Sequence, residues 1–400
     1  MQLNETALRR KILSDKYNKI IFGLEKARDI YIVGGYIRDM VLNRKSPDRD
    51  YAVKGEFDQL LNSLAVKTGG KIIRMGKKGL HRIVLRNGVT LDFSLFKKDI
   101  ESDISERDFT VNSLAWSPER GIIDIDKGRE DLSRKLIRMT ALKNLREDPV
   151  RILRAFRLAE ELSFRIDRRT RSAIRMTKGM IKQAKNERIA LEFFKILNSP
   201  DPSRTLEMLL KDGVLGCIIF LNYQELRKRL KVVSMINKIY DGLPLRYKLI
   251  LDKRFAQNIS YRGLFRLEVL IGGLPRHMLS LSSAIIKRIT LLHRADNFLH
   301  KRRIRRGMLF DLFVLTGDAA IDFLITNRMI GSLRDYERYR KIIKKGLLTS
   351  AEIIRTTGIS PGPDLGRLIR MIKRGEFDHR VKTKKEGIQL IMKKLPPKEK

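Results

Sequence analysis

The sequence predicts an α+β fold, in which a mixed α/β head with a small β-sheet is followed by an all-α remainder. Up to about residue 126, short runs rich in β-branched and aromatic residues (IYIVGG, DYAVKG, KIIRMG, HRIVLRNG and VTLDFSLF) alternate with segments of helical periodicity. From about residue 140 onward, helical patterns are separated only by short breaks such as NSPDPS, DGLP, GGLP and SPGPD. The 400 residues, 42% of them hydrophobic, are enough for two to four modules.

The charge of the chain indicates a polyanionic partner. The formal net charge is +39, far more than solubility requires, and the basic excess is denser in residues 221–400 than in residues 1–220. Nucleic acid is the first candidate; a membrane surface is the second, but no basic amphipathic helix or lipidation signal stands out. The charged N-terminal stretch resembles no secretory signal, and no apolar run approaches the roughly 18 residues of a membrane span. We therefore expect a cytoplasmic protein without membrane association.

Cysteine and histidine usage restricts the kinds of metal site. Cys217 is the only cysteine, and the five histidines are scattered without paired zinc-ligand spacing. Any catalytic metal must therefore be held mainly by carboxylates.

Three aspartates and a glycine pair form the first candidate site. Gly34 and Gly35 follow a strand pattern and precede a helix, where a turn can approach a phosphate. Asp48 and Asp50 begin the next strand, where a period of two places both carboxylates on one face. Asp92 lies in another strand pattern and completes a candidate two-metal Mg²⁺ site. Taken singly, the glycine pair is most often only a turn and the two acids only a solvated strand start.

These residues belong to an ordered series of motifs that resembles the class II tRNA nucleotidyltransferase and bacterial poly(A) polymerase family, within the DNA polymerase beta superfamily. The matching blocks are Gly34–Asp39 with Asp48–Asp50, Arg107–Ala115, Asp126–Arg138, Glu147–Arg157 and Glu187–Glu192. They cover roughly residues 30 to 200, and beyond them only Gly358–Pro363 matches the C-terminal pattern. A chance match of so many blocks in the same order is improbable.

The resemblance implies both an architecture and an activity. It implies a catalytic nucleotidyltransferase head (1–139), a helical neck with a base-recognition helix (140–200), a helical body (201–310) and a basic helical tail that binds tRNA (311–400). The implied reaction adds C, or C and A, from CTP and ATP to the 3′ end of tRNA without a template, with Mg²⁺ as cofactor and pyrophosphate as product. No obligate protein partner is evident.

The implied catalytic and metal-binding residues are Asp48, Asp50 and Asp92. The implied nucleotide-binding residues are Gly34, Gly35, Arg38, Arg107, Asp108, Asn112, Glu147, Asp148, Arg151 and Arg154. Arg38 is expected either to contact the triphosphate or to form a structural ion pair with Asp39.

Asp148 and Arg151 have a chemical reason to read the base. Cytosine and adenine both present an amino donor beside a ring-nitrogen acceptor, whereas uracil and guanine present the reverse. A carboxylate acceptor beside a guanidinium donor fits C and A and leaves unpaired groups against U and G. The resemblance implies that Glu147 orients this pair. The alternative is an ordinary surface ion pair at a helix start.

The run Lys301, Arg302, Arg303, Arg305 and Arg306 is expected to bind RNA phosphates, or otherwise to form a solvated charged face.

Two departures from the family pattern bear on specificity. The residue before the Arg107 block is Glu106, where many relatives have a basic residue. The link KKDIESDISE before that block is short, whereas CCA-adding members carry a longer flexible loop there. We therefore expect C addition without the terminal A. A poly(A) polymerase and a non-catalytic RNA-binding protein are the alternatives.

Overall fold

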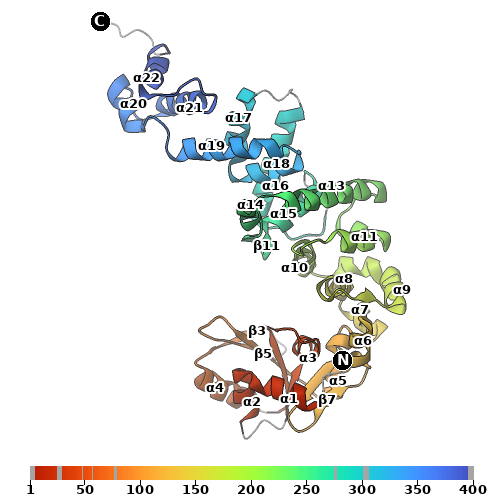
Figure 1. The fold of residues 1–400 in the computed structure, drawn as a ribbon. Helices are drawn as coiled ribbons and strands as arrows, with labels where there is room; N and C mark the ends of the chain where they lie inside the picture. The colour runs from red at the N-terminus through yellow and green to blue at the C-terminus, as the bar shows by residue number, and fades with distance from the viewer. Residues whose placement is uncertain are drawn as a thin grey trace. The chain divides into compact units, whose positions relative to one another are not determined.

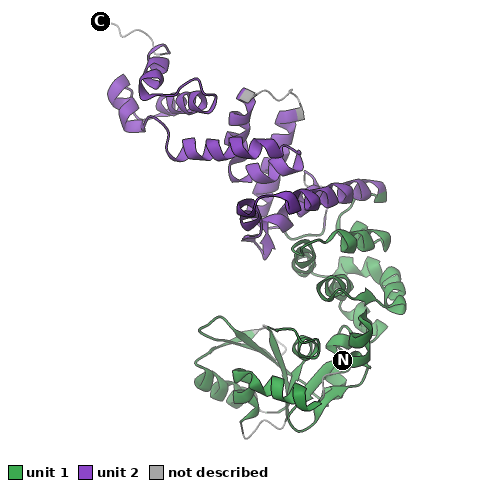
Figure 2. Cartoon of the chain, viewed as in Figure 1, with its two compact units in different colours: residues 1–223, 278–280 green, residues 224–277, 281–400 purple. Residues whose placement is uncertain are grey.

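The computed structural model describes residues 5–24, 29–46, 48–55, 57–75, 79–273, 277–300 and 306–394 (Figure 1). These residues form two compact units, one of residues 1–223 with 278–280 and one of residues 224–277 with 281–400 (Figure 2). Within the described ranges, no helix has the length and apolar character needed to cross a membrane.

The first unit begins with a seven-stranded sheet in the order β3-β4-β5-β2-β1-β6-β7. The strands are β1 (Ile30–Val33), β2 (Arg49–Val53), β3 (Lys71–Met75), β4 (Leu80–Val84), β5 (Thr90–Leu95), β6 (Leu114–Ser117) and β7 (Gly121–Asp124). β2 and β5 pair in parallel and the other neighbours pair antiparallel. All five β-rich runs of the sequence form strands, so the predicted mixed head is confirmed.

The two faces of this sheet differ in chemistry because side chains alternate along each strand. On one face, the rings of Tyr51 and Phe93 stack with centroids 5.0 Å apart, and Phe22 packs edge-on against Trp116 at 5.4 Å. Phe22 belongs to α2, so this face is covered by a helix and forms core. The residues next to Tyr51 and Phe93 in sequence therefore point to the opposite face.

The helices of the head precede, follow or connect these strands. They are α1 (Glu5–Ser14), α2 (Lys16–Phe22), α3 (Gly35–Val41), α4 (Phe57–Thr68), α5 (Ile100–Ser105) and α6 (Gly128–Arg134), with a short 3₁₀ turn at Thr110–Asn112.

The remainder of the first unit is helical. Its helices are α7 (Leu142–Glu147), α8 (Val150–Leu162), α9 (Arg168–Thr177), α10 (Asn186–Leu197), α11 (Ser203–Lys211) and α12 (Leu215–Ile218), with a 3₁₀ segment at Lys178–Gln183. Residues of α8 such as Ile152, Phe156 and Ala159 are buried at helical spacing, as are Phe193 and Ile196 of α10.

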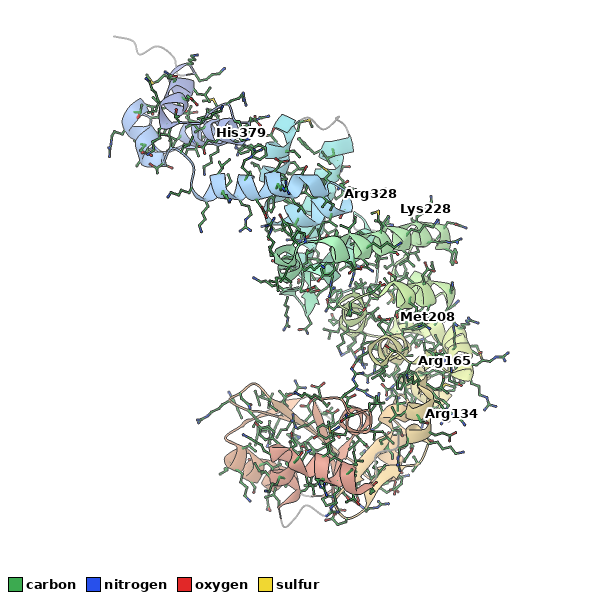
Figure 3. All side chains as sticks on the ribbon, viewed as in Figure 1. Arg134, Arg165, Met208, Lys228, Arg328 and His379 are labelled. Carbon is green, nitrogen blue, oxygen red and sulfur yellow. The ribbon has the colours of Figure 1, made fainter. Side chains whose placement is uncertain are left out.

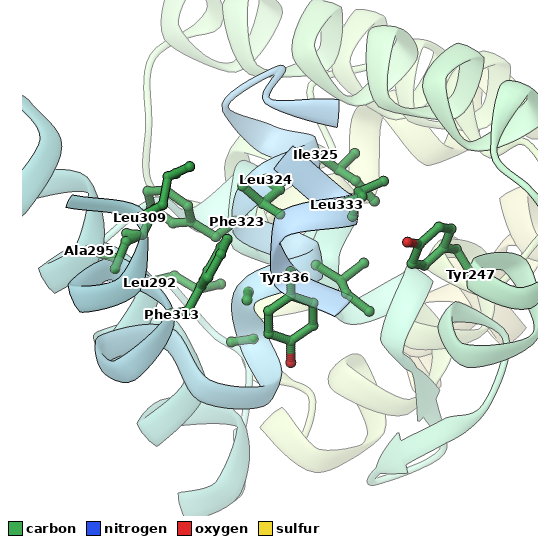
Figure 4. Close-up of a cluster of buried hydrophobic side chains, with 14 of the residues drawn as sticks. Tyr247, Leu292, Ala295, Leu309, Phe313, Phe323, Leu324, Ile325, Leu333 and Tyr336 are labelled. Atoms are coloured by element: carbon green, nitrogen blue, oxygen red, sulfur yellow. The ribbon is translucent and has the colours of Figure 1, made fainter. Parts of the chain in front are cut away.

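The second unit is also largely helical. Its helices are α13 (Tyr223–Gly242), α14 (Leu245–Leu251), α15 (Tyr261–Ile271), α16 (Ser283–His300), α17 (Arg306–Thr316), α18 (Ala320–Thr326), α19 (Leu333–Lys344), α20 (Ser350–Thr357), α21 (Pro363–Phe377) and α22 (Lys384–Met392), with 3₁₀ turns at Gly317–Ala319 and Ile330–Ser332. Figure 4 shows the main core of this unit, in which Phe313, Phe323 and Tyr336 meet. A smaller core holds α20, α21 and α22 together through Ile353 and Ile372.

Short strands of two small sheets interrupt the predicted all-α remainder, although the first of these strands still lies at the end of the predicted head. β8 (Leu136–Ile137) pairs with β9 (Arg165–Ile166), and β10 (Arg254–Ala256) pairs with β11 (Ile259–Ser260). β8 directly follows Lys135, which ends α6 in the left-handed conformation, and β9 follows soon after Ser163, which ends α8 in the same way. Extended pieces of two or three residues are too short to produce a period-two pattern.

Basic side chains are exposed on both units. Arg134 and Arg165 in the first unit, and Lys228 and Arg328 in the second, are examples labelled in Figure 3.

Candidate active site

The candidate metal ligands lie on the face of the sheet opposite the aromatic core. Asp50 is the second residue of β2, and it pairs in register with Asp92 of the parallel strand β5. Adjacent strands are about 4.8 Å apart, so these two carboxylates are neighbours on one face. Asp48 immediately precedes β2 and is exposed, two residues before Asp50. The fold thus places one candidate acid from each of two neighbouring strands side by side.

The surroundings of Asp50 disfavour its negative charge. Burial raises the pKa of Asp50, Asp92 and Asp48 raise it further, and Arg107 and Arg154 act in the opposite direction without cancelling the effect. A carboxylate in this setting gains from an added cation.

Asp92 already has a cationic partner. Nε and Nη2 of Arg82 each donate to a different oxygen of Asp92, both at 2.6 Å. Among the described residues, no three His, Cys, Asp or Glu side chains are gathered closely enough to hold a metal ion. The donor set of three carboxylates suits Mg²⁺, which prefers oxygen ligands, and the unfavourable charge on Asp50 fits a cation at this position.

The glycine turn contacts the next motif of the series. Gly34 has φ +73°, a conformation that favours glycine, and a Cβ atom there would lie 2.8 Å from Nη1 of Arg107. The N–H of Gly34 donates to the carbonyl of Leu114 at 2.9 Å. This N–H is therefore engaged within the protein, and the positive φ of the turn is what favours glycine here. Gly35 begins α3.

Three of the candidate nucleotide-binding residues of the head, Arg38, Asp108 and Asn112, form a connected, buried network. Nη1 of Arg38 donates to Oδ1 of Asn112 at 2.8 Å, and Nδ2 of Asn112 donates to Oδ1 of Asp108 at 2.9 Å. Arg38 also pairs with Asp39, at 2.9 Å, so the expected ion pair is present. Arg107 is held by Asp103 at 3.1 Å, while its Nε is buried without a hydrogen-bond partner in the described part of the protein.

Asp108 connects this network to the helical segment. Nε and Nη2 of Arg154 on α8 contact Oδ2 of Asp108 at 2.7 and 2.6 Å. Burial alone would raise the pKa of Asp108, but Arg154, Asn112 and the backbone N–H of Phe109 outweigh it and hold this pKa below its ordinary value.

The base-reading candidates lie at a break between two helices. α7 ends at Glu147, α8 begins at Val150, and Asp148 and Pro149 lie between them. Nε of Arg151 is 3.9 Å from Oδ2 of Asp148, so the two charges are near each other but not hydrogen-bonded. Glu147 lies 3.6 Å from Lys143, one turn earlier.

The side chain that holds Asp148 is Arg188, which lies in one of the matching motifs but was not among the expected site residues. Nη1 and Nη2 of Arg188 on α10 donate to the two oxygens of Asp148 at 3.0 and 2.7 Å. Arg151 instead donates to the carbonyl of Asn144 at 3.2 Å. No spacing rule connects residues 148 and 188, so only the packing of α10 on α8 could identify this pair.

The predicted RNA-binding run falls largely outside the described residues. Lys301, Arg302, Arg303 and Arg305 are not described, and of Arg306 only the backbone, at the start of α17, is described.

We expect Asp108→Asn to lower the free energy of unfolding by roughly 3 kcal/mol at neutral pH, because Arg154 loses its close carboxylate partner at 2.6 Å and keeps only the longer contact with Glu192 at 3.9 Å. Because the pKa of Asp108 is lowered in the folded protein, its ionisation stabilises the fold at pH values above the ordinary pKa of 3.8. This stabilisation is lost as the pH falls through the pKa of Asp108 in the folded protein. Urea unfolding at several pH values should therefore show the difference between wild type and variant shrinking below about pH 4. A difference that stays constant on acidification would contradict the assigned charge state of Asp108.

Two family models match the chain. Residues 30–138 match the poly A polymerase head domain, and residues 163–219 match a probable RNA- and SrmB-binding site of polymerase A. The first spans the whole sheet, and the second begins just after α8.

Relatives of the chain are similar along most of its length. The chain is 27% identical over 384 residues to a CC-adding tRNA nucleotidyltransferase of Synechocystis, covering 89% of this chain and 91% of the relative. It is 26% identical to an A-adding tRNA nucleotidyltransferase of Deinococcus radiodurans, covering 90% and 94%. Its fold is similar to that of the Thermotoga maritima CCA-adding enzyme solved with tRNA, with a TM-score of 0.78, 21% identity and coverage of 99% and 100%. The head model, these relatives and the ordered motifs agree, and the chain belongs to the class II tRNA nucleotidyltransferase (CCA-adding enzyme) family, with a head of the poly(A) polymerase type.

Proposed function

We propose that this enzyme adds C residues from CTP to the 3′ end of tRNA and releases pyrophosphate. The observation that carries the proposal is the pairing of Asp50 with Asp92 across the parallel strands β2 and β5, beside a network that leads to the base-reading helix. The expected cytoplasmic location and the domain boundaries at residues 139, 200 and 310 remain part of the proposal.

Asp48, Asp50 and Asp92 would hold Mg²⁺. When bound, the metal lowers the pKa of the attacking 3′ hydroxyl and neutralises the triphosphate and the leaving pyrophosphate. Arg107 and Arg38 are two of the cations proposed to meet phosphate or ribose oxygens, and the buried Nε of Arg107, which has no hydrogen-bond partner among the described residues, is a further donor. Asn112, itself bonded to Asp108, orients Arg38 from the interior, and Asp103 holds Arg107.

Asp148 and Arg151 would select the base. Asp148 accepts a hydrogen bond from the amino group of cytosine, and Arg151 donates a hydrogen bond to the ring nitrogen. Because Arg151 and Asp148 are 3.9 Å apart, neither side chain has to break a hydrogen bond with the other to meet a base. Arg188 on α10 positions Asp148 through its two hydrogen bonds to the carboxylate oxygens.

The segment before Arg107 supports restriction to C. Residues 97–106 contain α5, whose Ile100 and Ile104 are buried in the head core with Tyr31, Phe96 and Ala115. A segment packed in this way is poorly suited to act as a mobile lever that would re-aim Asp148 and Arg151 from C to A.

The decisive experiment offers three tRNAs, ending at the discriminator, at C and at CC, with each nucleoside triphosphate supplied separately. We expect two C residues on the first tRNA, one on the second and none on the third. Efficient addition of a single A to the CC-ending tRNA would contradict C-only addition. Long A tracts on varied RNAs would instead favour a poly(A) polymerase.

We expect Asp50→Asn to reduce nucleotide incorporation by at least about a thousandfold while the protein stays folded, because removing one metal ligand disables both metal functions. The matched control is Asp58→Asn, since Asp58 is an exposed acid of α4 that pairs only loosely with Arg74 at 3.4 Å. Single-turnover rates and circular dichroism of both variants are the measurements. A folded Asp50→Asn protein with wild-type rates would exclude Asp50 as a ligand.

We expect Arg188→Ala to relax base selection while retaining most CTP incorporation. Without its two hydrogen bonds to Arg188, Asp148 samples other rotamers, and the discrimination of roughly 1–3 kcal/mol that a bidentate base contact provides should fall. The measurement is the ratio of kcat/KM for CTP to that for UTP, with Arg169→Ala on the exposed part of α9 as control. An unchanged ratio would show that Asp148 needs no support from α10.

A further inference from the structure

One arginine shares a row of side chains with the candidate metal ligands. In the antiparallel pairing of β4 with β5, Arg82 lies directly opposite Asp92, and Asp92 in turn lies beside Asp50 on β2. Residues opposite one another in adjacent strands share a face of the sheet. Arg82, Asp92 and Asp50 therefore form one line across three neighbouring strands, on the face away from Tyr51 and Phe93.

The contact between Arg82 and Asp92 is a two-point ion pair. Two nitrogens of the guanidinium group meet two oxygens of the carboxylate at 2.6 Å, the short distance typical of charge-assisted hydrogen bonds. The side chain of Asp92 is 23% exposed and that of Arg82 is 37% exposed, so the pair is partly shielded from solvent. The pKa of Arg82 is raised, first by its hydrogen bonds to Asp92 and further by the charges of Asp50 and Asp48, so the group stays cationic.

This pair affects what a divalent cation meets at the site. Both oxygens of Asp92 are engaged by Arg82, and a bound cation would lie near a fixed positive charge. An anionic ligand that accepts hydrogen bonds from the guanidinium group would free the oxygens of Asp92 and neutralise the positive charge of Arg82. A triphosphate offers oxygens that arginine binds in the same two-point manner.

We propose that Arg82 is a counter-ion that occupies Asp92 in the metal-free enzyme, so that a divalent cation binds firmly only together with a nucleoside triphosphate. In this role Arg82 is a positioning residue that couples the binding of metal to the binding of nucleotide. The inference rests on the proposed metal site of Asp48, Asp50 and Asp92.

The test measures Mn²⁺ binding to the full-length protein by electron paramagnetic resonance of free Mn²⁺, with no reaction taking place. With MnCl₂ alone, we expect Arg82→Gln to bind Mn²⁺ about tenfold more tightly than wild type, because a neighbouring positive charge has been removed. With the non-hydrolysable analogue α,β-methylene-CTP present, the difference in Mn²⁺ affinity between Arg82→Gln and wild type should become smaller, because Arg82 of the wild type then binds the triphosphate of the analogue and releases Asp92.

Arg74→Gln is the matched control. Arg74 lies on the adjacent strand β3, opposite His81 and therefore on the other face of the sheet, and it pairs with the exposed Asp58 at 3.4 Å. This variant changes the net charge equally but should leave Mn²⁺ affinity at the wild-type value. Arg82→Lys keeps the charge and gives up the two-point contact, so it should bind Mn²⁺ with intermediate affinity even if the Gln variant is poorly folded.

The outcomes distinguish the role of Arg82 from the metal site itself. In one outcome, wild type binds Mn²⁺, Asp50→Asn does not, and both Arg82 variants bind Mn²⁺ no more tightly than Arg74→Gln. This outcome overturns the counter-ion role of Arg82 and leaves the proposed metal site standing. If wild type and Asp50→Asn bind Mn²⁺ equally, the proposed metal site fails and the role of Arg82 fails with it.

Discussion

The ion pair between Asp108 and Arg154 is the constraint on which the geometry of the site depends. A fully buried carboxylate is costly unless it is paired and hydrogen-bonded, and Asp108 receives bonds from Arg154, Asn112 and the backbone N–H of Phe109. Arg154 belongs to α8, whereas Asn112 bonds onward to Arg38 of α3. Because any shift of α8 would separate Arg154 from the Asp108 carboxylate, this ion pair holds α8 in a fixed position relative to the head. The proposed base-reading side chains of Asp148 and Arg151, at the start of α8, are thereby fixed relative to the acids of the sheet.

Helix α8 carries two arginines with close carboxylate partners and one, the proposed base-reading Arg151, whose carboxylate partner is farther away. Arg151, Arg154 and Arg157 follow one another at intervals of three residues, so they lie along one side of the helix. Arg154 and Arg157 have carboxylate partners at 2.6 to 2.7 Å, in Asp108 and Glu192. Arg151 is 3.9 Å from Asp148 and donates to the backbone carbonyl of Asn144 at 3.2 Å. The first two are therefore committed to the fold, whereas Arg151 can exchange a weak partner for a base.

Periodicity made the placement of the acids predictable from the sequence. Alternation predicts that Asp48 and Asp50 share one face, and the parallel pairing of β2 with β5 brings Asp92 beside Asp50. The partners of these acids could not be predicted, because which arginine meets which carboxylate depends on strand register and helix packing. Arg82 reaches Asp92 only through the pairing of β4 with β5, and Arg188 reaches Asp148 only through the packing of α10 on α8. Likewise, a glycine pair predicts a turn, but the engagement of the Gly34 N–H by Leu114 depends on where β6 lies.

The packing of the head also bears on why one pocket would serve one nucleotide. The segment between β5 and Arg107 is anchored at several points: Asp99 caps α5, Asp103 pairs with Arg107, and the carbonyl of Ile104 accepts the hydroxyl of Ser113 at 2.6 Å. Asn144 at the start of the helical segment also donates to the carbonyl of Ser105 at 2.8 Å. Moving this segment would expose Ile100 and Ile104, at about 1.5–3 kcal/mol each, before any of these hydrogen bonds is counted. A reorganisation on that scale exceeds the roughly 1–3 kcal/mol that a bidentate base contact could return. The balance of these free energies therefore favours a pocket of fixed shape. The pairing edge of a purine lies farther from the sugar than that of a pyrimidine, so a pocket of fixed shape cannot fit both.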